Sequence, residues 1–248
     1  MLLIKHLESR EPFFISGGYI ICKRVIKIKG CIFDLDGTLF DSMDIWSRIG
    51  PDSLKKRGIT PPPDYARTIF TMSFAQSAAY TVRYFELPCT PENLMQEWDE
   101  TAALVYGSEA RLKPGVGDYL LALRENGWKL GVATTLHERV YRPALERHRL
   151  LGLFDVLCGA DEVPLPKSDP EIFLLCAKRL GLEPGECVVF EDLLVAVRSA
   201  KSAGMQTVGV WDKASAMDWE EIKNTAGRVI TSFEREDLPF LDKLRCIW

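Results

Sequence analysis

The 248-residue sequence predicts an α/β protein built on a parallel sheet that helices cover on both faces. From residue 28 onward, short apolar runs alternate with stretches of helical periodicity. Runs such as Val188-Val189-Phe190 are continuously apolar, as in strands that are buried on both sides. Residues 42–112 differ, because they show helical periodicity and no convincing strand. We therefore expect a Rossmann-like parallel sheet core with a small inserted α-helical domain.

The sheet core is expected to contain five strands with helices between them. The strands are predicted at Ile28–Phe33, Leu130–Ala133, Phe154–Cys158, Cys187–Phe190 and Thr207–Val210. The helices are predicted at Gly117–Glu125, Leu136–Arg149, Asp169–Gly181 and Val195–Ala203. Thr134-Thr135 is interpreted as a capping pair before the second helix, and Asp169-Pro170 as the N-cap and N1 proline of the third.

The inserted segment predicts a bundle of four helices. They are expected near Met43–Arg57, Asp64–Phe70, Phe74–Phe85 and Pro91–Arg111. The predicted domains are an N-terminal extension (1–27), a core domain (28–42 and 113–248) and a helical cap domain (43–112). Residues 1–27 allow a hairpin around Gly17-Gly18 or a poorly ordered extension. Two linkers, Phe40–Asp44 and Arg111–Gly115, are expected to form a hinge between core and cap.

Composition and charge exclude several classes of protein. No apolar run approaches the roughly 18 residues of a membrane-spanning helix, and charged residues interrupt the first ten positions, where a signal peptide needs an apolar stretch. The net charge of −4 argues against a nucleic-acid partner. Seven cysteines without a Cys-x-x-Cys pair, with only three histidines, fit neither a disulfide framework nor a zinc site. We expect a cytoplasmic protein with reduced thiols.

Two carboxylates, Asp34 and Asp36, lie where the first predicted strand runs into a turn. Two acids at the end of a buried strand lose hydration and repel each other unless a cation lies between them. Gly37 relaxes the backbone, so that main-chain N–H groups can point at an anion. The structural alternative is that Asp36-Gly37 only ends the strand in a turn.

The segment Cys31-Ile-Phe-Asp-Leu-Asp-Gly-Thr-Leu-Phe-Asp-Ser42 resembles the first motif of the haloacid dehalogenase-like hydrolase superfamily. The chain is similar to the branch of phosphatases and β-phosphoglucomutases, in which a helical cap follows this motif. The other three motifs are matched, in order, by the strand ending at Thr134, by Lys167-Ser-Asp-Pro-Glu-Ile-Phe173 and by Val188-Val-Phe-Glu-Asp192. All four fall at the carboxyl ends of predicted strands or in the loops after them, where open α/β sheets bind ligands.

Each later motif also has a structural interpretation when it is taken alone. Thr134 would be a helix cap, Lys167 a surface lysine, and the acids 191 and 192 the N-terminus of a helix. The sequence departs from the family pattern in two places. Ser168 stands where the family has Pro, and Leu193-Leu194-Val195-Ala196 replaces the usual Ser-x-x-Gly after Asp192, which puts the loop around the metal in doubt.

The resemblance implies an Mg²⁺-dependent phosphatase that hydrolyses a small phosphorylated metabolite through an aspartyl phosphate on Asp34. Asp36 would be the acid and base, with a pKa raised by its acidic neighbours, while Thr134 and Lys167 would bind the phosphoryl group. The metal would be held by Asp34, the backbone carbonyl of Asp36, and Asp192, with Glu191 as a ligand or as a partner of the ligands. The candidate substrate contacts are Trp46, Phe70, Phe74, Tyr80, Arg67, Arg83 and the loop near Thr71–Ala75. Most of these side chains also fit the core of the helical bundle or its surface.

Other readings of the same motifs stay open. In β-phosphoglucomutases, a histidine of the first cap helix lies twelve positions after the nucleophile, and here that position holds Trp46, which favours hydrolysis. The related dehalogenases lack the second acid, and phosphonoacetaldehyde hydrolases need a cap lysine that residues 58–110 do not contain. A phospho-acceptor or a non-catalytic binding relative is a further alternative. The sequence leaves the substrate and the oligomeric state open.

Overall fold

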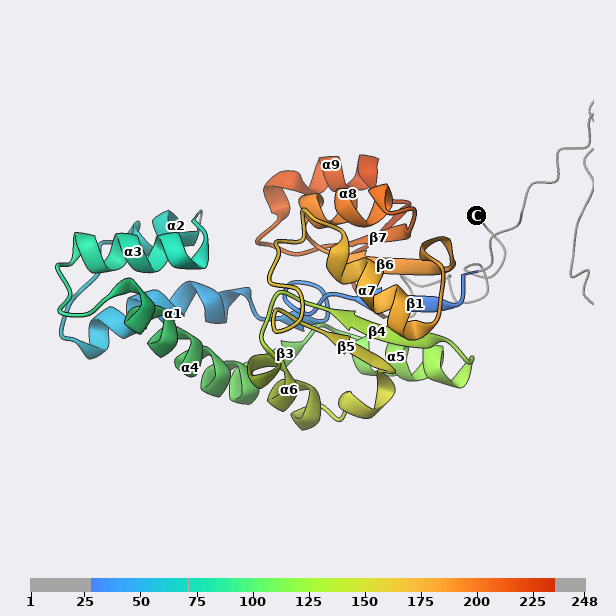
Figure 1. The fold of residues 1–248 in the computed structure, drawn as a ribbon, viewed down its shortest axis with the longest axis horizontal. Coiled ribbons are helices and arrows are strands. Elements are labelled where there is room, and N and C mark those ends of the chain that lie inside the picture. The colour runs from blue at the N-terminus through green and yellow to red at the C-terminus, as the bar shows by residue number, and fades with distance from the viewer. Residues whose placement is uncertain (1–27, 71, 235–248) are drawn as a thin grey trace, which may run out of the picture.

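A six-stranded parallel sheet forms the centre of the molecule, with strand order β5-β4-β1-β6-β7-β8. The structure, a computed structural model, describes residues 28–70 and 72–234. Helices pack on both faces of the sheet (Figure 1), and the predicted α/β fold is confirmed. The hairpin predicted within residues 1–27 lies outside the described residues. No helix in the described ranges is long and apolar enough to cross a membrane.

The predicted strands and helices of the core are all present, with small shifts at their ends. The strands of the sheet are β1 (Gly30–Phe33), β4 (Lys129–Ala133), β5 (Val156–Cys158), β6 (Cys187–Glu191), β7 (Gln206–Val210) and β8 (Arg228–Ile230). The helices that cover it are α5 (Val116–Glu125), α6 (Glu138–Arg147), α7 (Glu171–Leu180), α8 (Leu194–Ser202) and α9 (Trp219–Thr225). The sequence did not predict β8 and α9, because both are short and β8 has no apolar run.

Two helix starts differ from the prediction. Helix α6 begins at Glu138 with His137 as its N-cap, and Thr134 lies outside it. The Oγ1 of Thr134 accepts a hydrogen bond from the backbone N–H of Leu136 at 3.2 Å, so this side chain forms a local turn instead of a helix cap. In α7, Pro170 takes the N-cap position, while the Asp169 carboxylate accepts the Glu171 N–H at 2.9 Å.

Alternate residues of the strands supply two separate apolar cores. Cys31 and Phe33 of β1 belong to the core on the side of α5, whereas Ile32 belongs to the core that α7 and α8 cover. Strand β1 lies between β4 and β6, so the chain first builds the sheet outward to β5 and then crosses back to β6. This reversal next to β1 is the topological switch point at which open parallel sheets bind ligands.

Four helices lie between the short strands β2 (Phe40–Asp41) and β3 (Arg111–Leu112), which pair antiparallel. We call them the four-helix insert: α1 (Met43–Lys56), α2 (Tyr65–Phe70), α3 (Phe74–Tyr84) and α4 (Pro91–Glu109). The insert extends away from the sheet along the long axis of the molecule (Figure 1). The sequence did not predict the β2–β3 pair, and the division into separate core and cap domains stays a prediction.

Side-chain caps explain where two insert helices begin. The hydroxyl of Ser73 accepts the Gln76 N–H, and the Gln76 side chain accepts the Ser73 N–H, which forms a capping box at α3. Thr90 and Asn93 form the same arrangement at α4, with proline at the first helical position.

Helix α4 joins the insert to the core by packing on α6. Asp99 of α4 forms an ion pair with Arg139 of α6. At the end of α6, Arg147 Nε donates to the carbonyl of Gly107 at 2.8 Å, and His148 Nε2 lies 2.8 Å from the carbonyl oxygen of Ala110. These contacts hold the insert near the carboxyl edge of the sheet.

Candidate active site

Two strand ends and one loop bring a lysine and three carboxylates into a buried cluster. Asp34 follows β1, Glu191 ends β6, Asp192 comes next, and Lys167 lies in the loop before α7. The Lys167 ammonium donates to Asp34 Oδ1 and, at 2.5 Å, to Glu191 Oε1. All four residues are at most 5% exposed. One oxygen each of Asp34, Glu191 and Asp192 lies within 4.8 Å of the others.

The electrostatics of this cluster are unbalanced, because one cation faces three acids. Burial raises the pKa of Asp34 to about 7, and although Lys167 opposes this shift, Glu191 and Asp36 add to it. Burial, Glu191 and Asp34 likewise raise the pKa of Asp192 well above its ordinary value. Burial lowers the pKa of Lys167, but Asp34 and Glu191 outweigh that effect and keep the ammonium charged.

The residues of the cluster fit a divalent cation. Carboxylate oxygens are the donors that hard cations prefer, and the cluster holds more negative charge than Lys167 can neutralise. A cation among these oxygens would return the carboxylates to their ionised form and remove the repulsion that raises their pKa values. The structure therefore contains an acidic cluster that suits a divalent cation, and magnesium as that cation stays a prediction.

Two hydroxyl groups and a glycine fix Asp192. Thr38 Oγ1 donates to Asp192 Oδ1 at 3.5 Å, and Ser215 Oγ donates to Asp192 Oδ2 at 2.9 Å. Gly37 has a φ of 74°, and a Cβ there would lie 2.4 Å from Asp192 Oδ2, so only glycine leaves room for this carboxylate. Hydroxyl groups therefore still reach Asp192, although Leu193 replaces the serine that the family has after it.

A buried ion pair supports the loop that carries Ser215. Lys113 Nζ lies 3.0 Å from Asp212 Oδ2 and donates to the Trp211 carbonyl at 2.5 Å. The other Asp212 oxygen accepts the Ala214 N–H at 2.8 Å. Because Lys113 directly follows β3, this pair connects the end of the insert to the loop beside Asp192.

Asp36 has a separate environment, formed mainly by the insert. Its Oδ1 accepts a hydrogen bond from Ser42, directly before α1. The Nε1 of Trp46 on α1 and the hydroxyl of Tyr106 on α4 are buried with no hydrogen-bond partner among the described residues, and both act on the pKa of the Asp36 carboxyl. Burial raises the pKa of Asp36, while Ser42, Trp46, Tyr106 and Lys167 act in the opposite direction. The predicted direction agrees, but the cause is burial, and crowding by acidic neighbours was the wrong reason.

Thr134 is buried and lies at the same sheet edge, directly after β4. Its backbone N–H donates to the Cys158 carbonyl at 3.0 Å. The side-chain oxygen accepts the Leu136 N–H, which is compatible with donating the hydroxyl hydrogen to a phosphoryl oxygen. The structure thus places all six predicted site residues at the carboxyl edge of the sheet, and four of them form the buried cluster.

Sequence reasoning assigned no role to three neighbours of the acids: Ser42, Tyr106 and Ser215. Ser42 was part of the quoted first motif, so its position six residues after Asp36 was a usable signal. Tyr106 and Ser215 lie 70 or more residues beyond Asp34 in segments without a motif. Only the tertiary fold shows that they reach the site.

The chain is similar in sequence and in structure to known proteins. Residues 31–210 match the haloacid dehalogenase-like hydrolase family. The "Phosphorylated carbohydrates phosphatase" of Thermotoga maritima is 32% identical over 184 residues, which cover 73% of this chain and 84% of that protein. A Drosophila melanogaster protein named "Probable pseudouridine-5'-phosphatase" is 31% identical over 192 residues, 75% of this chain and 83% of that protein. The structure of CbbY from Rhodobacter sphaeroides in complex with phosphate is similar with a TM-score of 0.73, at 25% identity, covering 88% of this chain and 99% of that chain.

The chain therefore belongs to the haloacid dehalogenase-like hydrolase family. The family membership inferred from the four motifs is confirmed, and so is the predicted enzyme class, a phosphatase.

Proposed function

We propose that this protein is a magnesium-dependent phosphatase that hydrolyses a small phosphate monoester through a phosphorylated Asp34. The observation that carries the proposal is the pairing of two acids in different environments. Asp34 lies inside the charged cluster and accepts from Lys167, whereas Asp36 lies outside it, against Ser42, Trp46 and Tyr106. Two carboxyl groups whose surroundings differ in this way suit the roles of nucleophile and proton donor.

In the first step, an Asp34 oxygen attacks phosphorus and the bond from phosphorus to the leaving oxygen breaks. Lys167 neutralises charge on Asp34 and the phosphoryl oxygens, and Thr134 donates its hydroxyl hydrogen to the same group. Protonated Asp36 gives its proton to the leaving alkoxide. A proton donor matters here because an alkoxide is a poor leaving group without one.

In the second step, water attacks phosphorus and releases the Asp34 carboxylate. Asp36 is now ionised and takes a proton from this water, which returns both acids to their starting states. Inorganic phosphate then leaves. Burial raises the pKa of Asp36, which favours the protonated form that the first step needs.

Magnesium is the cation we assign to the cluster, held by Asp34, Asp192 and the backbone carbonyl of Asp36. When bound, it supplies positive charge that reduces the repulsion between the phosphate dianion and the carboxylates. Both Glu191 oxygens already accept hydrogen bonds, one from Lys167 and one from the Leu193 N–H at 2.8 Å. We therefore propose that Glu191 orients Lys167 rather than serving as a main ligand.

We propose further that the four-helix insert acts as a cap domain over the site. Trp46 and Tyr106, which contact Asp36, come from its first and fourth helices. Since Trp46 cannot shuttle a proton, the insert offers nothing like the histidine of the mutases at this position, and net hydrolysis is favoured over phosphoryl transfer to a second sugar hydroxyl. We place the protein in the cytoplasm and expect a small phosphorylated metabolite as its substrate.

The test is a phosphate-release screen over a panel of phosphate monoesters, with Mg²⁺ and with a chelator. We expect turnover of at least one small monoester and its loss when the metal is removed. Glucose 6-phosphate formed from glucose 1-phosphate without free phosphate would instead establish a mutase. An aspartyl phosphate that persists for hours without turnover would establish a phospho-acceptor.

A further inference from the structure

The four-helix insert contains a cavity of about 180 Å³. Its wall is lined by aromatic and aliphatic side chains and two serines: Trp46, Ser47, Ile49, Gly50, Ala66, Ile69, Met72, Phe74, Ser77 and Trp98. None of these residues is charged. A larger cavity of about 320 Å³ surrounds Gly181 at the end of α7 and contains none of the site residues.

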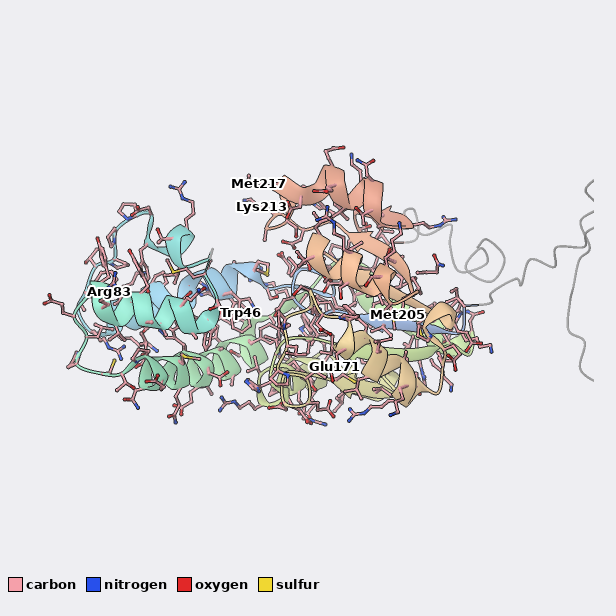
Figure 2. All side chains as sticks on the ribbon, turned by 45° about the horizontal axis from the view of Figure 1, so that its top comes forward. Trp46, Arg83, Glu171, Met205, Lys213 and Met217 are labelled. Atoms are coloured by element: carbon pink, nitrogen blue, oxygen red, sulfur yellow. The ribbon has the colours of Figure 1, made fainter. Side chains whose placement is uncertain are left out.

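Trp46 connects this cavity to the chemistry. The residue lines the cavity, and its Nε1 interacts with the Asp36 carboxyl. In Figure 2, Trp46 lies at the end of the insert that is nearest to the core. A group that occupies the cavity would therefore contact the residue that also contacts the proton donor, which is where the leaving group of a monoester must lie.

The size and lining of the cavity select a flat apolar group. A cavity of about 150 Å³ lined by aliphatic and aromatic residues holds one benzene molecule, so about 180 Å³ accommodates a single six-membered ring. Phe74 and Trp98 form one wall, with ring centroids 5.9 Å apart and planes tilted by 59°. Aromatic walls of this kind favour ring-to-ring contact with a planar ligand.

The polar atoms of the cavity discriminate against a polyol. The two serine hydroxyls already donate inside the protein, Ser47 to the Asp44 carbonyl at 2.7 Å and Ser77 to the Ile69 carbonyl at 2.9 Å. A sugar chain would lose its hydration there and gain few hydrogen bonds in return.

The indole N–H of Trp98 is a buried donor in this wall. Trp98 is only 2% exposed, and its Nε1 donates to no acceptor within the described residues. A buried indole N–H without a partner is unusual and costs free energy, which a ligand with a suitably placed acceptor would recover. The occupant should therefore carry a ring oxygen or nitrogen that accepts a hydrogen bond.

We infer that the leaving group of the substrate carries a planar heterocycle with a hydrogen-bond acceptor, and that this ring binds in the insert cavity between Trp46 and Trp98. The inference rests on the proposed phosphatase function and names its substrate class. It separates nucleoside-type monoesters from the phosphates of sugars and sugar alcohols.

The test compares uridine 5′-monophosphate with ribose 5-phosphate, which share the phosphorylated ribose and differ by one heterocyclic ring. We expect kcat/KM to be at least about tenfold higher for uridine 5′-monophosphate, since filling a pocket with a ring discriminates at least as strongly as a few methylene groups. Equal values, or a preference for ribose 5-phosphate, would overturn the inference and leave the phosphatase function intact.

Cavity variants locate the ring. Ala66→Leu fills the cavity and should lower kcat/KM for uridine 5′-monophosphate to about the value for ribose 5-phosphate. Ser47→Leu is the second cavity-filling variant if Ala66→Leu does not fold. Ala79→Leu is the matched control, because Ala79 is exposed on α3 and does not line the cavity. A preference that survives both filling variants would show that the ring binds elsewhere.

Binding to Asp34→Asn separates this inference from the proposed function, since calorimetry needs no turnover. In that background, uridine 5′-monophosphate should bind at least about tenfold more tightly than ribose 5-phosphate. Adding Trp98→Phe, which keeps the ring and removes the donor, should weaken uridine 5′-monophosphate about three- to tenfold and leave ribose 5-phosphate unchanged. If Asp34→Asn binds uridine 5′-monophosphate tightly but the native enzyme does not hydrolyse it, only the phosphatase proposal is contradicted. If the two ligands bind with equal affinity, the proposed substrate class is wrong.

Discussion

The sheet edge and the four-helix insert bring opposite kinds of side chain to one site. The sheet edge supplies Asp34, Lys167, Glu191 and Asp192, all buried and in contact or close to one another. The insert supplies aromatic groups around Asp36 and an uncharged cavity, while its own charges form ion pairs at or near the surface. The charged groups of the site thus lie at the sheet edge. The contrast predicts that core variants abolish turnover, whereas insert variants change pH dependence, selectivity or stability.

The largest expected effect is that of Asp34→Asn. An amide cannot act as the nucleophile, so we expect kcat to fall by at least about 10⁴-fold. Asp41→Asn, at an exposed position of β2, is the matched control and should keep its activity. The measurement is phosphate release together with trapping of the phosphorylated protein. If the variant still becomes phosphorylated, another residue is the nucleophile, and the contrast between the sheet edge and the insert does not hold.

Replacing the proton donor should have the next largest effect. Asp36→Asn should lower kcat by about 10²–10⁴-fold, the usual contribution of general acid–base catalysis. Substrates with good leaving groups should lose less, because an acidic phenol leaves without a proton. A loss that is equal for good and poor leaving groups would contradict the assignment of Asp36.

The insert should shift the pKa of Asp36, although Asp36 itself belongs to the sheet edge. Tyr106 lowers the pKa of Asp36, so Tyr106→Phe should raise that pKa. Since Asp36 must be protonated in the first step, the alkaline limb of the kcat/KM profile should move to higher pH. Tyr119→Phe is the matched control, because the Tyr119 hydroxyl is also buried with no hydrogen-bond partner in residues 28–70 and 72–234 but lies on α5 in the core. An unchanged alkaline limb in Tyr106→Phe would show that the insert does not act on Asp36.

The cation should change stability in a pH-dependent way. Burial raises the pKa of Asp34 to about 7, so the folded protein binds more protons than the unfolded chain between about pH 4 and 7. Without metal, this group's contribution to stability is therefore present at low pH and is lost as the pH rises through 7. Saturating Mg²⁺ should raise Tm by about 5 °C at pH 8 and by less at pH 5.5, where protons compete with the metal. The check is thermal unfolding in Mg²⁺ and in a chelator, and an equal Tm shift at both pH values would argue against binding at the carboxylate cluster.

The core was predictable from sequence because its signals are local. Each motif of the site ends a strand, and the carboxyl ends of parallel strands meet at one edge, so Asp34, Thr134 and Asp192 could be placed together without coordinates. The hydrogen-bond and electrostatic partners of these groups could not be predicted from the sequence. Tyr106 reaches Asp36 because of how α4 packs. Ser215 reaches Asp192 from a loop that the Lys113–Asp212 ion pair holds in place. Neither helix packing nor loop shape produces a recognisable sequence pattern. The cause of the raised pKa of Asp36 was missed for the same reason, since burial depends on the whole fold.

The smallest expected effect lies in the insert and concerns stability alone. Arg57 and Ser53 donate to Glu97, and Arg57 lowers the pKa of this carboxyl. A lowered pKa contributes stability above the unfolded value of about 4.3, and that contribution is lost as the pH falls through the folded pKa. Glu97→Gln should therefore lower the unfolding free energy by up to about 1 kcal/mol at pH 7, because the pair is partly exposed and screened by solvent. The difference from the native protein should shrink as the pH falls below the unfolded pKa of about 4.3. Glu100→Gln, on the same helix, should show no comparable pH-dependent loss. Phosphate release at pH 7 should be unchanged in Glu97→Gln, and a lowered kcat would mean that the ion pairs of the insert, and not only its aromatic groups, reach the chemistry.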